Sequence, residues 1–143
     1  MLVKVCGMRD GENIRLVENL SVDLIGFIFY PRSPRYVNSL PEYLPRSAGR
    51  VGVFVNEELC VIEDTVIRYG LTHVQLHGSE ILQHYTGNVP FLIAGGIGEN
   101  DAERVLDFRH PQFAGVDLNS RFEVSPGIKD IEKLDRIITK LKR

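Results

Sequence analysis

Short runs of apolar, often β-branched residues alternate along this chain with longer stretches in which apolar and charged residues recur at helical spacing. This alternation predicts strands that take turns with helices, the pattern of a parallel sheet covered by helices. The runs, such as LIGFIFY at residues 24–30, are nearly uninterrupted, as expected of strands buried on both faces. The sequence therefore predicts an α/β fold, although the pattern alone does not separate an open sheet from a closed barrel.

Six strands and six helices are expected from this pattern. The strands are Val3–Cys6, Leu24–Tyr30, Arg50–Val55, Thr72–His77, Pro90–Ala94 and Phe113–Leu118. The helices are Asp10–Asn19, Pro41–Ser47, Glu57–Tyr69, Ser79–Tyr85, Asn100–Phe108 and Asp130–Lys142. The helix over 57–69 is the clearest of these, because Leu59, Ile62 and Val66 follow a 3–4 spacing.

The bulk composition limits the function classes. The 143 residues suit one domain over 1–143, and the net charge of −2 offers no broad basic surface for nucleic acid. Cys6 and Cys60 lie far apart without metal-type spacing, which favours a reducing compartment and no metal site. No run of about eighteen apolar residues suggests a membrane span, and no signal region opens the chain. We expect a cytoplasmic protein without cofactor, nucleic-acid partner or membrane partner.

Cys6 ends the first strand and is followed by a glycine. Active sites of parallel α/β folds gather at the carboxyl ends of the strands. A thiol at that place can serve as a base or nucleophile if a cationic or helix-end environment lowers its pKa. The alternative, which the residues leave open, is a buried structural cysteine.

Two further segments carry polar groups directly after or within strands. Arg32 and Arg35 lie in a proline-stiffened loop, FYPRSPRY, that could hold a carboxylate or phosphate, although a solvated loop is an equal alternative. Gln75 and His77 point to one face of their strand and could both contact a substrate at a barrel mouth. A lone histidine is more often a bystander, so His77 by itself decides little.

The last two strands end in loops suited to an anion. Gly95 and Gly96 follow one strand and lead into a helix, and a Gly-Gly turn lets backbone N–H groups approach a phosphate. Asp117, Asn119 and Ser120 end the next strand. Two such loops at the end of the chain match the phosphate site of many β/α-barrels.

Together these segments resemble phosphoribosylanthranilate isomerase, a tryptophan-biosynthesis family of (β/α) barrels. The resemblance is carried by the strings KVCGM, GFIFYPRSPRYV, RVGVFVNE, VQLHGSE, AGGIGEN and GVDLNSRFEVSPGIKD, in family order and over nearly the whole chain. It implies an Amadori rearrangement of phosphoribosylanthranilate to the carboxyphenylamino-deoxyribulose phosphate. A general acid helps to open the ribose ring to a Schiff base, and a base then removes the proton from the neighbouring carbon.

The resemblance also assigns roles to individual residues. It implies that Cys6 is the base and that Arg35 engages the anthranilate part of the substrate. The other residues expected to bind substrate are Gln75, His77 and Asp117. Those expected to hold the phosphate are Gly95, Gly96, Asn119 and Ser120. It implies a small phosphorylated substrate as the partner and a monomer or weak dimer.

The chain departs from the family pattern in its middle. VQLHGSE passes straight into ILQHYTGNVPFLIAGG, so two strands with their helices, the aspartate that serves as the family's general acid and a Gly-rich loop are missing at a junction near residues 79–82. Length agrees independently, because a complete barrel needs at least about 200 residues. A smaller departure is Arg121, which stands where the family often has glycine.

We therefore expect an incomplete TIM-type barrel with about six of eight units, in which the last strand pairs with the first. A gap should remain between Thr72–His77 and Pro90–Ala94, and its two unpaired edges should promote aggregation or strand exchange. Two functions stay open at this point. The chain is either an isomerase that has lost a segment and most of its activity, or a non-catalytic truncated barrel that retains only phosphate-ligand binding.

Overall fold

The computed structural model describes residues 1–77, 91–94, 96–109, 111 and 113–143, and it contains the expected alternation of strands and helices. The elements that form the main layers are β1 (Leu2–Val5), α1 (Gly11–Glu18), β2 (Leu24–Ile28), β3 (Gly49–Val55), α2 (Leu59–Tyr69), β4 (His73–His77), β5 (Phe91–Ala94), α3 (Ala102–Asp107), β6 (Phe113–Leu118) and α4 (Ile131–Leu141). The smaller elements are the 3-10 helices η2 (Glu99–Asp101) and η3 (Ser120–Phe122) and the strands β7 (Glu123–Ser125) and β8 (Ile128–Lys129).

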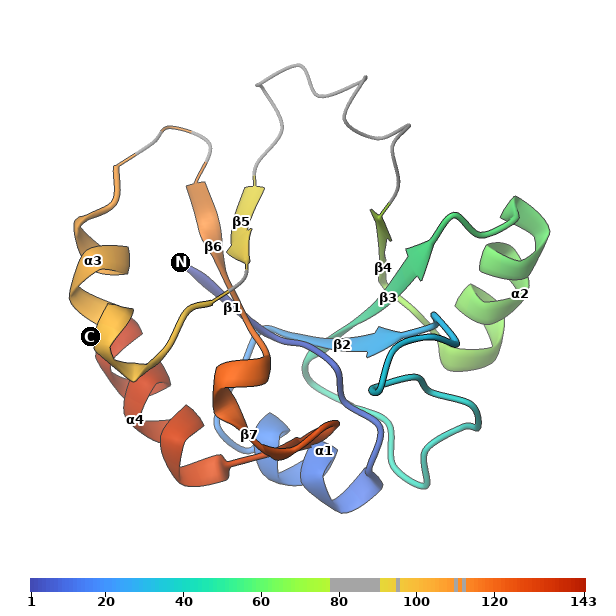
Figure 1. Cartoon of the computed structure of the whole chain (residues 1–143), viewed down its shortest axis with the longest axis horizontal. Coiled ribbons are helices and arrows are strands. Elements are labelled where there is room, and N and C mark those ends of the chain that lie inside the picture. Colours follow the sequence, from blue (N-terminus) through green and yellow to red (C-terminus); the bar gives the residue numbers. More distant parts are fainter. Residues whose placement is uncertain (78–90, 95, 110, 112) are drawn as a thin grey trace.

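One six-stranded sheet in the order β4-β3-β2-β1-β6-β5 organises the fold. Every pairing within it is parallel, and β1 lies between β2 and β6, with Val5 opposite Leu118. The predicted pairing of the last strand of this sheet with the first is confirmed. Among the described residues β4 and β5 do not pair with each other but form the two edges, which confirms the predicted gap (Figure 1). The sheet is thus a curled part of a TIM-type barrel.

The core lies between the sheet and the helices that cover it. Val3 and Val5 of β1 are fully buried, as are Leu134 and Ile137 of α4. The helices begin at side-chain caps, because Asp10 accepts a hydrogen bond from the Asn13 N–H at 2.7 Å and Asp130 caps α4 in the same way. The buried face of β1 thus belongs to the core that positions the loop after it.

One predicted helix is wrong. Residues 41–47 form no helix but an irregular loop with bends. Pro45 disfavours helical geometry at Leu44 and lacks an N–H of its own. The backbone N–H groups of Ser47 and Ala48 instead donate to the carboxylate of Glu18 at 2.7 and 3.0 Å.

Three other differences concern local structure. The predicted helix Ser79–Tyr85 lies outside the described residues. The start of the helix predicted over 100–108 is the 3-10 turn η2, and the β7–β8 hairpin was not predicted. No helix in the described part of the chain is both long and apolar enough to cross a membrane.

Candidate active site

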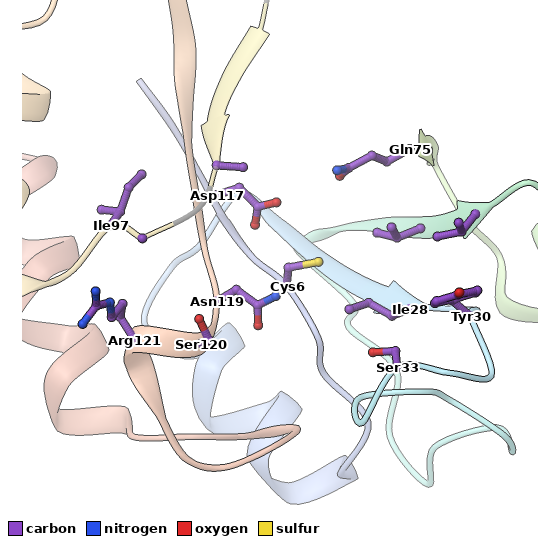
Figure 2. A pocket seen from close by; sticks show the side chains of 14 residues that line it. Cys6, Ile28, Tyr30, Ser33, Gln75, Ile97, Asp117, Asn119, Ser120 and Arg121 are labelled. Atoms are coloured by element: carbon purple, nitrogen blue, oxygen red, sulfur yellow. The ribbon is translucent and has the colours of Figure 1, made fainter. Parts of the chain in front are cut away.

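A pocket of about 310 Å³ opens at the carboxyl ends of the strands (Figure 2). The residues that line it are Cys6, Ile28, Tyr30, Ser33, Val53, Val55, Gln75, Ala94, Gly96, Ile97, Asp117, Asn119, Ser120 and Arg121. They come from loops and strands on both sides of the open barrel, so the fold brings together segments that are far apart in the sequence. Its lining combines apolar side chains with a few polar groups, as in other small-molecule sites.

Cys6 lies at the base of this pocket, one residue beyond β1. Its backbone N–H donates to the Leu118 carbonyl at 3.0 Å, and only 4% of the residue is exposed. Gly26 of β2 provides the space for the thiol, because a Cβ at that position would lie 2.7 Å from the Cys6 Sγ and 3.1 Å from the Lys4 Cε. A side chain at position 26 would therefore displace both Cys6 and Lys4.

A buried ion pair lies beside the thiol. The Lys4 ammonium, which belongs to a residue only 1% exposed, donates to Asp117 Oδ2 at 2.7 Å and to Gln75 Oε1 at 2.8 Å. Asp117 Oδ1 is buried without a hydrogen-bond partner among the described residues. A buried carboxylate oxygen without a partner is costly, and here it belongs to a residue that lines the pocket. The geometry therefore leaves this oxygen available to a ligand hydroxyl or amine.

Burial and charge oppose each other at Cys6. Burial raises the pKa of the thiol and outweighs Lys4, whose nearby positive charge lowers it. Burial lowers the pKa of Lys4, but the neighbouring Cys6 and Asp117 overcome this, so that its net pKa is raised. The sequence suggested that a cationic environment would lower the thiol pKa. The cation is present, yet desolvation of the thiolate dominates in the ligand-free pocket.

The residues expected to hold a phosphate lie on one side of the pocket. Gly96, Asn119 and Ser120 line it together with Arg121. Gly96 has φ +69°, a left-handed conformation that glycine adopts at little cost. Gly95 lies outside the described residues.

Only some of the residues expected to contact the rest of the substrate line the pocket. Gln75 and Asp117 line the pocket. The backbone of His77 ends β4, but its side chain is not among the described ones. Arg35 lies outside the set of described residues that line the pocket, and its guanidinium is bound to Glu123, with Nε–Oε1 at 2.9 Å and Nη2–Oε2 at 2.7 Å.

Lys4, Glu123 and Lys129 were not singled out by sequence reasoning. Lys4 shares the inward face of β1 with Cys6 two residues later, a period-2 signal that could have indicated it. Glu123 and Lys129 gave no comparable signal, because their roles depend on a hairpin that brings β7 beside β8.

Comparison with known proteins decides the family. The model of the N-(5'-phosphoribosyl)anthranilate (PRA) isomerase family matches residues 3–90 and 81–140 of the chain. The chain belongs to the phosphoribosylanthranilate isomerase family. The two matched ranges overlap at residues 81–90, next to the junction near 79–82 where the sequence indicated a missing segment.

Individual relatives agree with this assignment. The N-(5'-phosphoribosyl)anthranilate isomerase of Phocaeicola vulgatus is 35% identical over 202 aligned residues that cover 100% of this chain and 98% of the relative. Since this chain has only 143 residues, the relative contains a segment without counterpart here. A phosphoribosylanthranilate isomerase from Thermotoga maritima is 26% identical, with a TM-score of 0.79 and 99% of each chain covered.

A further isomerase structure contains a ligand. It is 27% identical to this chain, with a TM-score of 0.69, and it covers 99% of this chain while 98% of its own length is matched. That protein is in complex with reduced 1-(o-carboxyphenylamino)-1-deoxyribulose 5-phosphate.

Proposed function

We propose that the pocket binds phosphoribosylanthranilate and that Cys6 is the base of the family's isomerisation. The observation that carries this proposal is the position of the Cys6 thiol, which lines a pocket bounded on one side by Asn119 and Ser120. A substrate whose phosphate contacts these loops would extend its ribose over Cys6. The family comparisons favour this function over a barrel that only binds phosphate ligands.

The surrounding groups support the proton transfer. The base must reach a carbon-bound proton, and a thiolate does so only when its charge is compensated. The Lys4 ammonium provides that compensation, and Asp117 and Gln75 hold it in place. Loss of the thiol proton would leave the Cys6 thiolate beside the Lys4 ammonium. The thiolate sulfur would then take up the proton released from the substrate carbon and become a thiol again.

The opening of the ribose ring needs a separate proton donor. The aspartate that serves the family in this role belongs to the missing segment. We therefore propose that this chain retains substrate binding and the base, while ring opening limits turnover. Asp117 is paired with Lys4 and is not assigned this role.

The test separates binding from chemistry. Calorimetry with the reduced product analogue measures binding, and the loss of phosphoribosylanthranilate fluorescence measures turnover in a barrel completed with the relative's segment. Cys6→Ala should abolish turnover but change analogue affinity little, because the thiol does not hold the phosphate. Cys60→Ala, which removes the exposed cysteine, is the matched control and should behave as the parent. Full turnover by Cys6→Ala would remove Cys6 from the mechanism.

A further inference from the structure

A buried cluster of charges lies behind the anion-binding side of the pocket. The Lys129 ammonium, whose side chain is 0% exposed, contacts Glu123 Oε1 at 2.6 Å and Asn119 Oδ1 at 2.9 Å. Glu123, whose side chain is 6% exposed, also receives the two-pronged contact from Arg35. The Glu123 carboxylate therefore joins the loop after β2 to strand β8, and Lys129 of β8 contacts Asn119 in the loop after β6. Glu123 and Lys129 do not line the pocket themselves.

The lysine determines how Asn119 faces the pocket. An ammonium group can only donate hydrogen bonds, so its partner on the amide must be the oxygen, Oδ1. The amide nitrogen, with two donors, is then turned the other way. Figure 2 shows this nitrogen on the side of Cys6, and Asn119 lines the pocket. An apolar residue or a carboxylate at position 129 has no donor for Asn119 Oδ1 and would not impose this orientation.

Steric contacts reinforce the arrangement. Gly7, directly after Cys6, has φ +77°, and a Cβ there would lie 2.6 Å from the Arg35 Cδ and 2.9 Å from the Asn119 Oδ1. The stem of Arg35 and the amide of Asn119 therefore meet over the backbone next to the thiol. Two cations, Arg35 and Lys129, and one carboxylate, Glu123, together carry a net positive charge beside the pocket.

We propose that Glu123 and Lys129 are positioning residues. Lys129 fixes Asn119 as a hydrogen-bond donor for the oxygens of an anionic ligand, and Glu123 holds Lys129 and Arg35 in place. The inference rests on the proposed function, since it takes the ligand to be a phosphorylated carboxylate. Glu123 and Lys129 act only through Asn119 and Arg35.

A double-mutant cycle tests the route through Asn119. The probes are inorganic phosphate and the reduced product analogue, measured by calorimetry. Lys129→Met should weaken analogue binding about tenfold, the effect of one misplaced hydrogen bond. In an Asn119→Ala background, Lys129→Met should change analogue affinity less than about twofold, because the Asn119 amide that Lys129 orients is already absent. Lys140→Met, at an exposed lysine of α4, is the matched control and should bind as the parent. Additive effects, or parental affinity in Lys129→Met, would overturn the inference.

Glu123→Gln tests the same idea without loss of volume, should Lys129→Met fail to fold. It removes a negative charge, so a purely electrostatic effect would tighten anion binding. Positioning requires the opposite result, weaker binding, because Arg35 and Lys129 lose the group that holds them. Tighter binding therefore contradicts the inference. A parent chain that binds neither probe overturns the proposed function as well, whereas a parent that binds while the variants behave additively overturns this inference alone.

Discussion

Helices α2 and α4 have the same length, eleven residues, but differ sharply in what they bury. Leu134, Ile137, Ile138 and Leu141 of α4 are all at most 5% exposed. On α2, by contrast, Leu59, Val61 and Ile67 are 69%, 42% and 81% exposed. Each apolar side chain left in water forgoes about 1.5–3 kcal/mol of burial. The apolar residues of α2 are thus those of a helix that packs against a neighbour, although no described residue buries these side chains.

The strands show the same contrast. β1 has a neighbour on both sides, and Val3, Lys4 and Val5 are at most 1% exposed. β4 is an edge strand, and its Val74 is 41% exposed. The part of the sheet around β1 therefore contains the close packing and the charged groups of the site, whereas β4 pairs only with β3 among the described residues. Among the described residues, the part of the fold beside the junction is therefore the less covered one, whereas Cys6 lies in the well-packed part.

The largest expected effect is on turnover. The change is insertion, at residues 79–82, of the segment that the Phocaeicola vulgatus isomerase has and this chain lacks. It should raise the rate at which phosphoribosylanthranilate fluorescence is lost by more than about 10²- to 10⁴-fold, the contribution of one general acid. We expect a larger increase in rate than the general acid alone provides, because the insertion also closes the barrel wall. The same insertion should protect the backbone N–H groups of β4 from hydrogen exchange and leave those of β1 unchanged.

A control insertion distinguishes the two contributions. The same segment with its acidic aspartate replaced by asparagine should protect β4 equally but restore little turnover. Robust turnover by the 143-residue chain without insertion would show that another group supplies the acid.

The second prediction concerns the stability of the intact half. The carboxylate of Glu18, on α1, accepts hydrogen bonds from the backbone N–H groups of Arg46, Ser47 and Ala48 and from the hydroxyl of Tyr43. Glu18→Ala should lower the free energy of unfolding by about 2–3 kcal/mol, because buried donors are left without an acceptor. Glu12→Ala on the same helix, which removes an exposed pair with Arg15, should cost less than about 0.5 kcal/mol. Urea unfolding followed by circular dichroism measures both.

The same carboxylate gives a pH dependence. Burial raises the pKa of Glu18, but the hydrogen bonds from Tyr43, Ala48 and Ser47 outweigh it and hold the pKa at about 2. A carboxyl group with a depressed folded pKa stabilises the protein above its ordinary pKa of 4.5, and this stability is lost as the pH falls toward 2. Glu18→Ala should therefore lose part of the stability change that the parent shows over this range. An identical acid profile in both proteins would contradict the role of Glu18.

The elements that the sequence predicted correctly are those set by local pattern. Short runs rich in apolar residues indicated the six strands, and the position of Phe113–Leu118 was predicted to the residue. The helix expected over 41–47 failed because a distant carboxylate, that of Glu18, binds the backbone there in place of helical hydrogen bonds. Such tertiary hydrogen bonds have no periodicity in the sequence.

The site shows the same limit. Strand ends and the family motifs indicated Cys6, Asn119 and Ser120, since loop positions at strand ends share one edge of a parallel sheet. The partner of Arg35 could not be predicted, because Glu123 is 88 residues away and reaches it only through the β7–β8 hairpin.

The third prediction tests the charge beside the thiol. Lys4→Met should raise the pKa of Cys6, because the positive charge that lowers it is removed while Asp117 remains. Removal of an adjacent opposite charge shifts a pKa by about one unit or more, so alkylation by iodoacetamide at pH 8 should slow about tenfold. The measurement is made with Cys60→Ser so that only Cys6 reacts. Lys140→Met is the control, and an unchanged rate in Lys4→Met would show that the ion pair does not act on Cys6.

The smallest expected effect concerns association, and it returns to the exposed face of α2. Exposed apolar side chains of α2, those of Leu59, Val61 and Ile67, and the edge strand β4, which pairs on one side only among the described residues, favour self-association. We expect the apparent mass in light scattering to rise with concentration, and Ile67→Lys to reduce that rise without altering the fold. Val124→Lys is the matched control, since Val124 is 68% exposed but lies on the β7–β8 hairpin of the intact half. If Val124→Lys reduces association equally, the exposed side chains of α2 have no special role. If the completed barrel associates as strongly as the 143-residue chain, the missing segment does not cover α2, and the contrast between the two halves must have another cause.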